Sequence, residues 1–252
     1  MRKLLLFAAT TILLTLSSAA QNINIYCEEQ NQSLGPDGKF TGLDIEIVSE
    51  IQKRVGNTDQ IQLVPWTRGL KYLDVEPNTM LFSMARTKER SEFYQWIGPI
   101  SDTAYGFYAK ADSPIVINSL DDAKKVASIG VYRNDIRDQF LTKQGFTNLD
   151  RASNNFSNLK KLMAGRVVVI ASTSLAIKSD TKKAGYSLQD VKFLYAFLKV
   201  PIYIAVSKNT DAKIVANWNA ALESMEKDGT LKAIFKKYLP DQELPGPEII
   251  VF

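Results

Sequence analysis

The residues of this chain best suited to chemistry are the arginines and hydroxyls that follow the apolar segment 80–82. Arg86, Thr87 and Arg90 come at the end of this segment, where open α/β sheets place their ligands. A guanidinium stays charged and offers a planar fork of donors, so Arg90 is the first candidate for a carboxylate clamp. The same spacing also fits a solvated turn of charged residues. The pattern therefore predicts an anion-binding strand end, with the solvated turn as the alternative.

Composition excludes several classes of active site. The 252-residue chain has no histidine and one cysteine, Cys27. The absence of histidine rules out His-based triads, His proton shuttles and the usual zinc sites. A lone cysteine forms neither an internal disulfide nor a Cys-rich metal site. Any catalysis would depend on carboxylates, hydroxyls or lysine, so we expect a binding protein that is not an enzyme and that uses no metal or cofactor.

The first twenty residues have the layout of a secretory signal. Arg2 and Lys3 precede the apolar run 4–16, and small residues end at Ala20, the expected cleavage point. The run is shorter than the roughly 20 residues that a transmembrane helix needs. Removing the two basic residues leaves 29 basic and 27 acidic residues, a balance that argues against nucleic acid as a partner. Because Cys27 lies too far from the cleavage point for a lipid anchor, we expect a free, monomeric periplasmic protein.

Apolar patterning predicts alternating strands and helices. Apolar residues recur at helical spacing from Leu43 to Val55 and stop at Gly56, which predicts an amphipathic helix. The alternation indicates an α/β protein with a mostly parallel sheet covered on both faces. The predicted strands are 23–26, 61–64, 80–84, 126–131, 167–171, 192–195 and 202–206. Helix-capping residues are expected at Ser119, Asn134-Asp135 and Ser157.

The order of these elements suggests two lobes. The pattern changes at the extended aromatic segment 105–108, and Val200-Pro201 is a plausible return point. Two crossings imply two hinge strands with a ligand cleft between the lobes. The predicted division is a signal segment 1–20, a first lobe of 21–107 and 202–252, and a second lobe of 108–201.

Three stretches, 37–44, 87–99 and 227–239, together resemble the family 3 extracellular solute-binding proteins, the periplasmic receptors of ABC importers for polar amino acids and related solutes. The resemblance extends over essentially the whole mature chain. It implies two α/β lobes joined by two strands that close on a ligand by a hinge motion. It also implies two partners, a small carboxylate-bearing solute and an inner-membrane ABC permease.

The resemblance also assigns first-lobe residues to the site. Arg90 matches the arginine that holds a ligand carboxylate, and Trp66 matches an aromatic residue that stacks on the ligand. Ser83 and Ala85 match neighbouring positions that supply hydroxyl or backbone contacts. The expected first-lobe set is Glu28, Glu29, Trp66, Ser83, Met84, Ala85, Arg86 and Arg90.

In the second lobe, Asp135 and Ile136 match a turn whose following helix offers backbone N–H groups to the ligand carboxylate. We expect the main role of Asp135 to be that of a helix cap, with contact to the ligand as its second role. Ser172 and Thr173 lie where amino-acid-binding relatives usually place a carboxylate for the ligand ammonium. Since an unpaired buried ammonium costs several kcal/mol, this difference leaves the ligand class open.

The ligand class and the choice between a receptor and an enzyme both depend on the roles of Glu28 and Glu29. Either glutamate could pair with the ammonium; otherwise the ligand is not an ordinary α-amino acid. The resemblance also allows an enzyme on the same fold, a cyclohexadienyl-dehydratase-like protein with one of these glutamates as general acid. A periplasmic sensor subunit is the third hypothesis.

Overall fold

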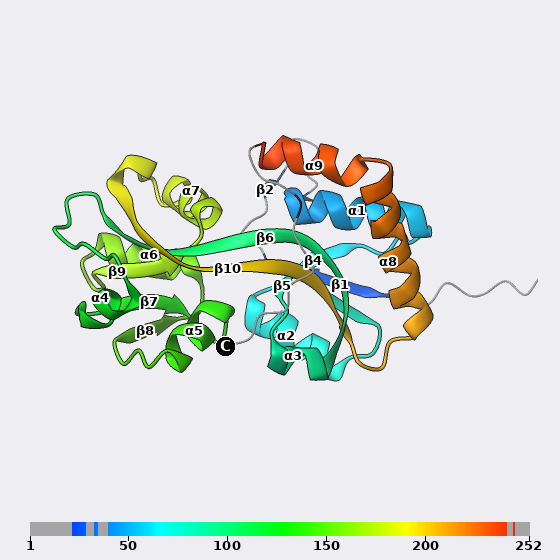
Figure 1. Cartoon of the computed structure of the whole chain (residues 1–252), viewed down its shortest axis with the longest axis horizontal. Coiled ribbons are helices and arrows are strands. Elements are labelled where there is room, and N and C mark those ends of the chain that lie inside the picture. Colours follow the sequence, from blue (N-terminus) through cyan, green and yellow to red (C-terminus); the bar gives the residue numbers. More distant parts are fainter. Residues whose placement is uncertain (1–21, 29–32, 35–39, 241–243, 245–252) are drawn as a thin grey trace, which may run out of the picture.

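A computed structural model describes residues 22–28, 33–34, 40–240 and 244. Two α/β lobes lie at either end of an elongated molecule, and two long strands run between them (Figure 1). These are β6 (Tyr94–Lys110) and β10 (Val191–Ser207), which pair antiparallel along their length. The predicted two-lobed α/β fold with two hinge strands is confirmed. Glu29 and the predicted signal segment 1–20 lie outside the described residues.

One eight-stranded mixed sheet extends through both lobes, in the order β4-β1-β5-β10-β6-β9-β7-β8. In the first lobe, β1 pairs parallel with both β4 and β5, and β5 pairs antiparallel with β10. The first-lobe strands are β1 (Asn24–Cys27), β4 (Ile61–Leu63) and β5 (Thr79–Ala85), with a small pair β2 (Ser33–Leu34) and β3 (Phe40–Thr41). Its helices are α1 (Leu43–Val55), α2 (Trp66–Val75), α3 (Lys88–Phe93), α8 (Ala212–Lys227) and α9 (Thr230–Tyr238).

In the second lobe, β7 pairs parallel with β8 and β9, and β9 joins the antiparallel strand β6. Its strands are β7 (Ile129–Tyr132), β8 (Leu149–Ala152) and β9 (Val169–Ser172). Its helices are α4 (Leu120–Lys125), α5 (Ile136–Lys143), α6 (Asn155–Met163) and α7 (Ser174–Lys183), followed by the 3₁₀ turn η2 (Leu188–Asp190). Within the described ranges, no helix has the length and apolar content that crossing a bilayer requires.

Each lobe has its own apolar core. In the first lobe, Ile51 of α1, Trp218 of α8 and Phe235 of α9 pack against the β5 side chains Met80 and Phe82. A separate cluster in the second lobe gathers side chains of β6, β7, β9 and α5. Burial of these side chains stabilises each lobe by roughly 1.5–3 kcal/mol for every large residue removed from water. The cores hold the strand ends of both lobes in place around the space between them.

Several predicted elements differ from the structure. The segments 192–195 and 202–206 belong to one strand, β10, because pairing with β6 continues between them. The strand predicted at 126–131 begins at Ile129. Helix α6 is capped by Asn154, whose side chain accepts a hydrogen bond from the backbone N–H of Ser157. The predicted lobe boundaries, at 107/108 and 201/202, fall inside β6 and β10 and stay a prediction.

Candidate ligand-binding site

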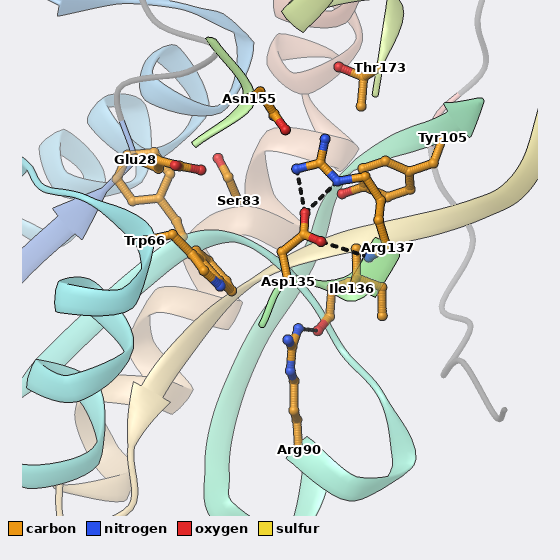
Figure 2. A pocket seen from close by; sticks show the side chains of 12 residues that line it. Glu28, Trp66, Ser83, Arg90, Tyr105, Asp135, Ile136, Arg137, Asn155 and Thr173 are labelled. Carbon is orange, nitrogen blue, oxygen red and sulfur yellow. Dashed lines mark hydrogen bonds and ion pairs between the residues drawn. The ribbon is translucent and has the colours of Figure 1, made fainter. Parts of the chain in front are cut away.

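A cleft between the lobes gathers most of the predicted site residues. Its volume is about 580 Å³ with the open mouth included. Strand ends and helix starts of both lobes surround it, and their side chains point toward a common centre (Figure 2). It is lined by Glu28, Trp66, Phe82, Ser83, Ala85, Arg90, Tyr105, Asp135, Ile136, Arg137, Asn155 and Thr173.

Arg90 lies on α3, a helix that begins after Thr87 because the Thr87 hydroxyl accepts the Arg90 backbone N–H. The Arg90 side chain is 8% exposed. Its Nη1 donates to the carbonyl of Ala85 at 3.0 Å, and its Nη2 donates to Oε1 of Gln139 in the second lobe at 3.3 Å. Its guanidinium carbon lies 5.7 Å from the centre of the Trp66 ring. These contacts hold a buried cation at the cleft with part of its donor set still unused.

Ser83 sits in a β-bulge of β5. Two residues of β5, Phe82 and Ser83, lie between Leu81 and Met84, whereas the facing segment of β10 has only Ile204 between their partners. Ser83 itself has a φ of 62°, which is rare for a residue with a side chain. Its hydroxyl donates to the Asp44 carboxylate at 2.5 Å, and burial raises the pKa of Asp44. The bulge interrupts the ladder where Ser83 and its neighbours line the cleft.

Glu28 follows β1 and is linked to both lobes. Its carboxylate is hydrogen-bonded to the Tyr132 hydroxyl at the end of β7, and that hydroxyl accepts the backbone N–H of Trp66 at 3.2 Å. The indole Nε1 of Trp66 donates to the Asn134 carbonyl at 3.4 Å. Burial raises the pKa of Glu28 to about 7, against the opposing effects of Tyr132 and of Arg137. Glu28 therefore changes charge near neutral pH.

Asp135 occupies the N-terminus of α5. One carboxylate oxygen accepts the backbone N–H groups of Arg137 at 2.9 Å and Asp138 at 3.2 Å. The other oxygen pairs with Nε and Nη2 of Arg137, which is 4% exposed. The remaining Arg137 nitrogen, Nη1, donates to the Ala171 carbonyl at 3.4 Å, and the guanidinium lies over the Tyr105 ring at 5.2 Å. The expected cap is present, and it also neutralises an arginine (Figure 2).

The two predicted hydroxyl contacts, Ser172 and Thr173, lie in different surroundings. Thr173 lines the cleft and caps α7, since its hydroxyl accepts the backbone N–H of Ala176 at 3.1 Å. Ser172 is buried inside β9, outside the cleft lining, and its hydroxyl has no hydrogen-bond partner among the described residues. Ser172 is the last residue of β9, and the structure does not place it in the cleft lining.

Two further predicted contacts, Met84 and Arg86, are absent from the cleft lining. Met84 is fully buried in a first-lobe apolar cluster. Arg86 donates from Nε to the Ser91 hydroxyl at 3.0 Å, and its guanidinium lies over the rings of Trp96 and Tyr203. Neither residue is among those that line the cleft, so the structure does not bring these two predicted contacts to the site.

Four lining residues were missed by sequence reasoning, namely Phe82, Tyr105, Arg137 and Asn155. Arg137 follows the predicted cap Asp135 by two positions, so its place in the first turn of the helix was foreseeable. The orientation of the Arg137 side chain into the cleft could not be predicted from this spacing. Within the described ranges, no group of three or more His, Cys, Asp or Glu side chains could hold a metal ion.

Residues 28–241 match the family described as bacterial extracellular solute-binding proteins, family 3. The chain belongs to this family. It is 25% identical over 205 residues to the probable amino-acid-binding protein YxeM of Bacillus subtilis, covering 80% of this chain and 77% of the relative. It is 25% identical over 208 residues to the L-cystine-binding protein TcyJ of Escherichia coli, covering 81% and 76%. The predicted family and the predicted role in solute binding are confirmed.

A solved structure of similar fold belongs to a sensor domain. A histidine kinase sensor domain with similarity to periplasmic binding proteins superposes with a TM-score of 0.79 at 19% identity, covering 89% of this chain and 98% of that chain. At this identity the likeness shows the fold alone.

Proposed function

We propose that this family 3 protein captures a small polar solute that carries both a carboxylate and a cationic group, as an amino acid does. The observation that supports this proposal is a pair of residues of opposite charge in one cleft, Arg90 on α3 and Glu28 at the end of β1. Arg90 holds the carboxylate through its unused donors, and Glu28 holds the ammonium. Trp66, between them on α2, provides an apolar and aromatic wall.

Closure of the lobes accompanies capture. The two lobes already touch beside the cleft, since Arg90 contacts Gln139 and Trp66 contacts Tyr132 and Asn134. A ligand that contacts both lobes stabilises the closed form over the open form by its differential affinity for the two. We propose that the closed, monomeric form acts in the periplasm and delivers its ligand to an inner-membrane ABC permease.

A thermal-shift screen of the mature protein, refolded to remove bound ligand, tests the proposal, because a ligand that binds the native state raises its melting temperature. The panel contains L-cystine, L-arginine, L-glutamine, L-glutamate, succinate and citrate. We expect stabilisation by at least one amino acid, lost in Arg90→Ala and reduced in Glu28→Gln. Stabilisation by succinate or citrate alone would refute the role of Glu28.

One observation favours an enzyme as a second candidate. A carboxyl group with a pKa of about 7, as burial produces at Glu28, is suited to act as a general acid. A dehydratase acting on a cyclic hydroxy acid would then lose turnover in Glu28→Gln while it retained substrate binding. Product formation by the wild type, followed by absorbance of the new unsaturated ring, separates this candidate from a receptor.

A further inference from the structure

The second-lobe wall of the cleft has an unusual distribution of charge. A helix N-terminus with free N–H groups, next to an arginine, attracts an anion. At the start of α5 the protein supplies that anion itself, since Asp135 accepts the N–H groups of Arg137 and Asp138 and pairs with the Arg137 guanidinium. Asp135 therefore already engages two backbone N–H groups of the first turn of α5 and two nitrogens of Arg137.

Each nitrogen of the Arg137 guanidinium already donates one hydrogen bond, and its charge is paired with the Asp135 carboxylate. Nε and Nη2 contact Asp135, and Nη1 contacts the Ala171 carbonyl. The guanidinium is closed in further by the rings of Tyr105 and Tyr132, at 5.2 and 5.9 Å. Among the lining residues that the structure describes, Arg90 is the cation that pairs with no carboxylate.

Three carboxyl groups surround the buried cation Arg137 at this wall. Glu28 faces it from the first lobe, and Asp180, buried on α7, interacts electrostatically with both Glu28 and Arg137. Lys183, which also acts on Asp180, is exposed and therefore screened by salt. A second carboxylate on the ligand would meet the lining residues Glu28 and Asp135, with Arg137 already paired with Asp135, whereas a cation would be attracted.

We infer that the cleft is a one-carboxylate site: Asp135 takes the place of a second anion, so the protein selects solutes whose other polar group is neutral or cationic and rejects acidic amino acids and dicarboxylates. This inference rests on the proposed function and narrows its ligand class. Asp135 is the specificity-determining residue, and Arg137 is the cation that it masks.

The matched ligands L-glutamine and L-glutamate test the inference, since they differ by one amide in place of one carboxylate. Isothermal titration calorimetry of the wild-type protein should show L-glutamate binding at least about 10-fold more weakly than L-glutamine, the effect expected for one unpaired charged group. L-arginine and agmatine, which lacks the carboxylate, complete the panel. Equal or tighter binding of L-glutamate to the wild type would overturn the inference.

The variant Asp135→Asn keeps a good helix cap but frees Arg137 from its partner. We expect it to gain affinity for L-glutamate relative to L-glutamine by about 10- to 100-fold. Adding Arg137→Gln should abolish that gain, which identifies Arg137 as the group that receives the second carboxylate. The matched control is Asp211→Asn, because Asp211 caps α8 through the Lys213 N–H and is absent from the cleft lining. It should leave the ratio unchanged.

The panel separates failure of this inference from failure of the proposed function. Binding of L-glutamate in preference to L-glutamine and L-arginine would refute the inference and keep the receptor role. Binding of agmatine without L-arginine would refute the carboxylate role of Arg90 and keep the cation preference. No binding by any of the four probes, together with no stabilisation by L-cystine in the thermal-shift panel, would overturn both. An unchanged ratio in folded Asp135→Asn would overturn the role of Asp135 alone.

Discussion

Replacement of Glu28 by glutamine should change how the stability of the ligand-free protein depends on pH. Burial raises the pKa of Glu28 from 4.5 to about 7 in the folded protein. Between these two pH values the folded state holds a proton on Glu28 that the unfolded state has lost. Because the unfolded state binds fewer protons there, the free energy of unfolding falls as the pH rises. Glutamine does not titrate, so Glu28→Gln lacks this contribution.

The size of the effect follows from the pKa difference. One pKa unit corresponds to 1.36 kcal/mol, so the wild type should lose up to about 3 kcal/mol of stability relative to Glu28→Gln between pH 4.5 and 7.5. The loss should level off above pH 7.5, where Glu28 is ionised in both states. Asp180, whose pKa burial raises to about 6, titrates in both proteins, so most of its contribution is common to the two curves.

Urea unfolding at half-unit pH intervals, followed by tryptophan fluorescence, measures this difference. The matched control is Glu89→Gln. Glu89 is exposed, and its bond to Lys143 lowers its pKa to about 2, so its contribution is constant above pH 4.5 and is lost only as the pH falls further. We expect the curve of this control to run parallel to the wild type. Parallel curves for the wild type and Glu28→Gln would refute the assignment of a near-neutral pKa to Glu28.

Three further predictions concern separate parts of the molecule. Arg90→Ala should weaken binding of the stabilising amino acid by about 10- to 100-fold in calorimetry, and Arg90→Lys should not restore it, because an ammonium lacks the planar fork; full affinity in either variant would contradict the clamp. Trp66→Phe removes the Nε1 contact to Asn134 but keeps an aromatic ring, so small-angle X-ray scattering should give a larger ligand-free radius of gyration than the wild type; an equal radius would count against this contact in closure. Trp218→Ala should lower the free energy of unfolding by about 3–5 kcal/mol in urea, since the side chain is 2% exposed, without changing affinity at native conditions; a loss below about 1 kcal/mol would contradict its place in the core.

Local patterns predicted much of the fold. The helix Leu43–Val55 ends where the sequence indicates, because Gly56 adopts the left-handed conformation with φ 72° that a glycine after a helix permits. The strand ends that carry Ser83 and Glu28 were foreseeable from apolar runs followed by polar residues. The common edge of a parallel sheet then brings such ends together without further information from the side chains.

Features that depend on pairing between distant segments could not be predicted in this way. Strand β10 was divided in two because the exposed Lys199 and the proline at position 201 interrupt its apolar pattern, whereas its pairing with β6 continues past them. Arg137 was missed for a similar reason. Its spacing fits a helix surface as well as a cleft, and the carbonyl of Ala171 that orients it lies on another strand.

The contacts between the lobes link selection of the ligand to closure. Trp66, Arg90 and Glu28 each contact the ligand cleft, and each also contacts the second lobe through Tyr132, Asn134 or Gln139. A ligand that fits therefore strengthens groups that already hold the lobes together. A ligand with a second carboxylate has the opposite effect, because it would meet Asp135 at the start of α5 only when the lobes close. If the cleft is the one-carboxylate site proposed above, discrimination resides in the closed state, because an acidic solute would oppose closure.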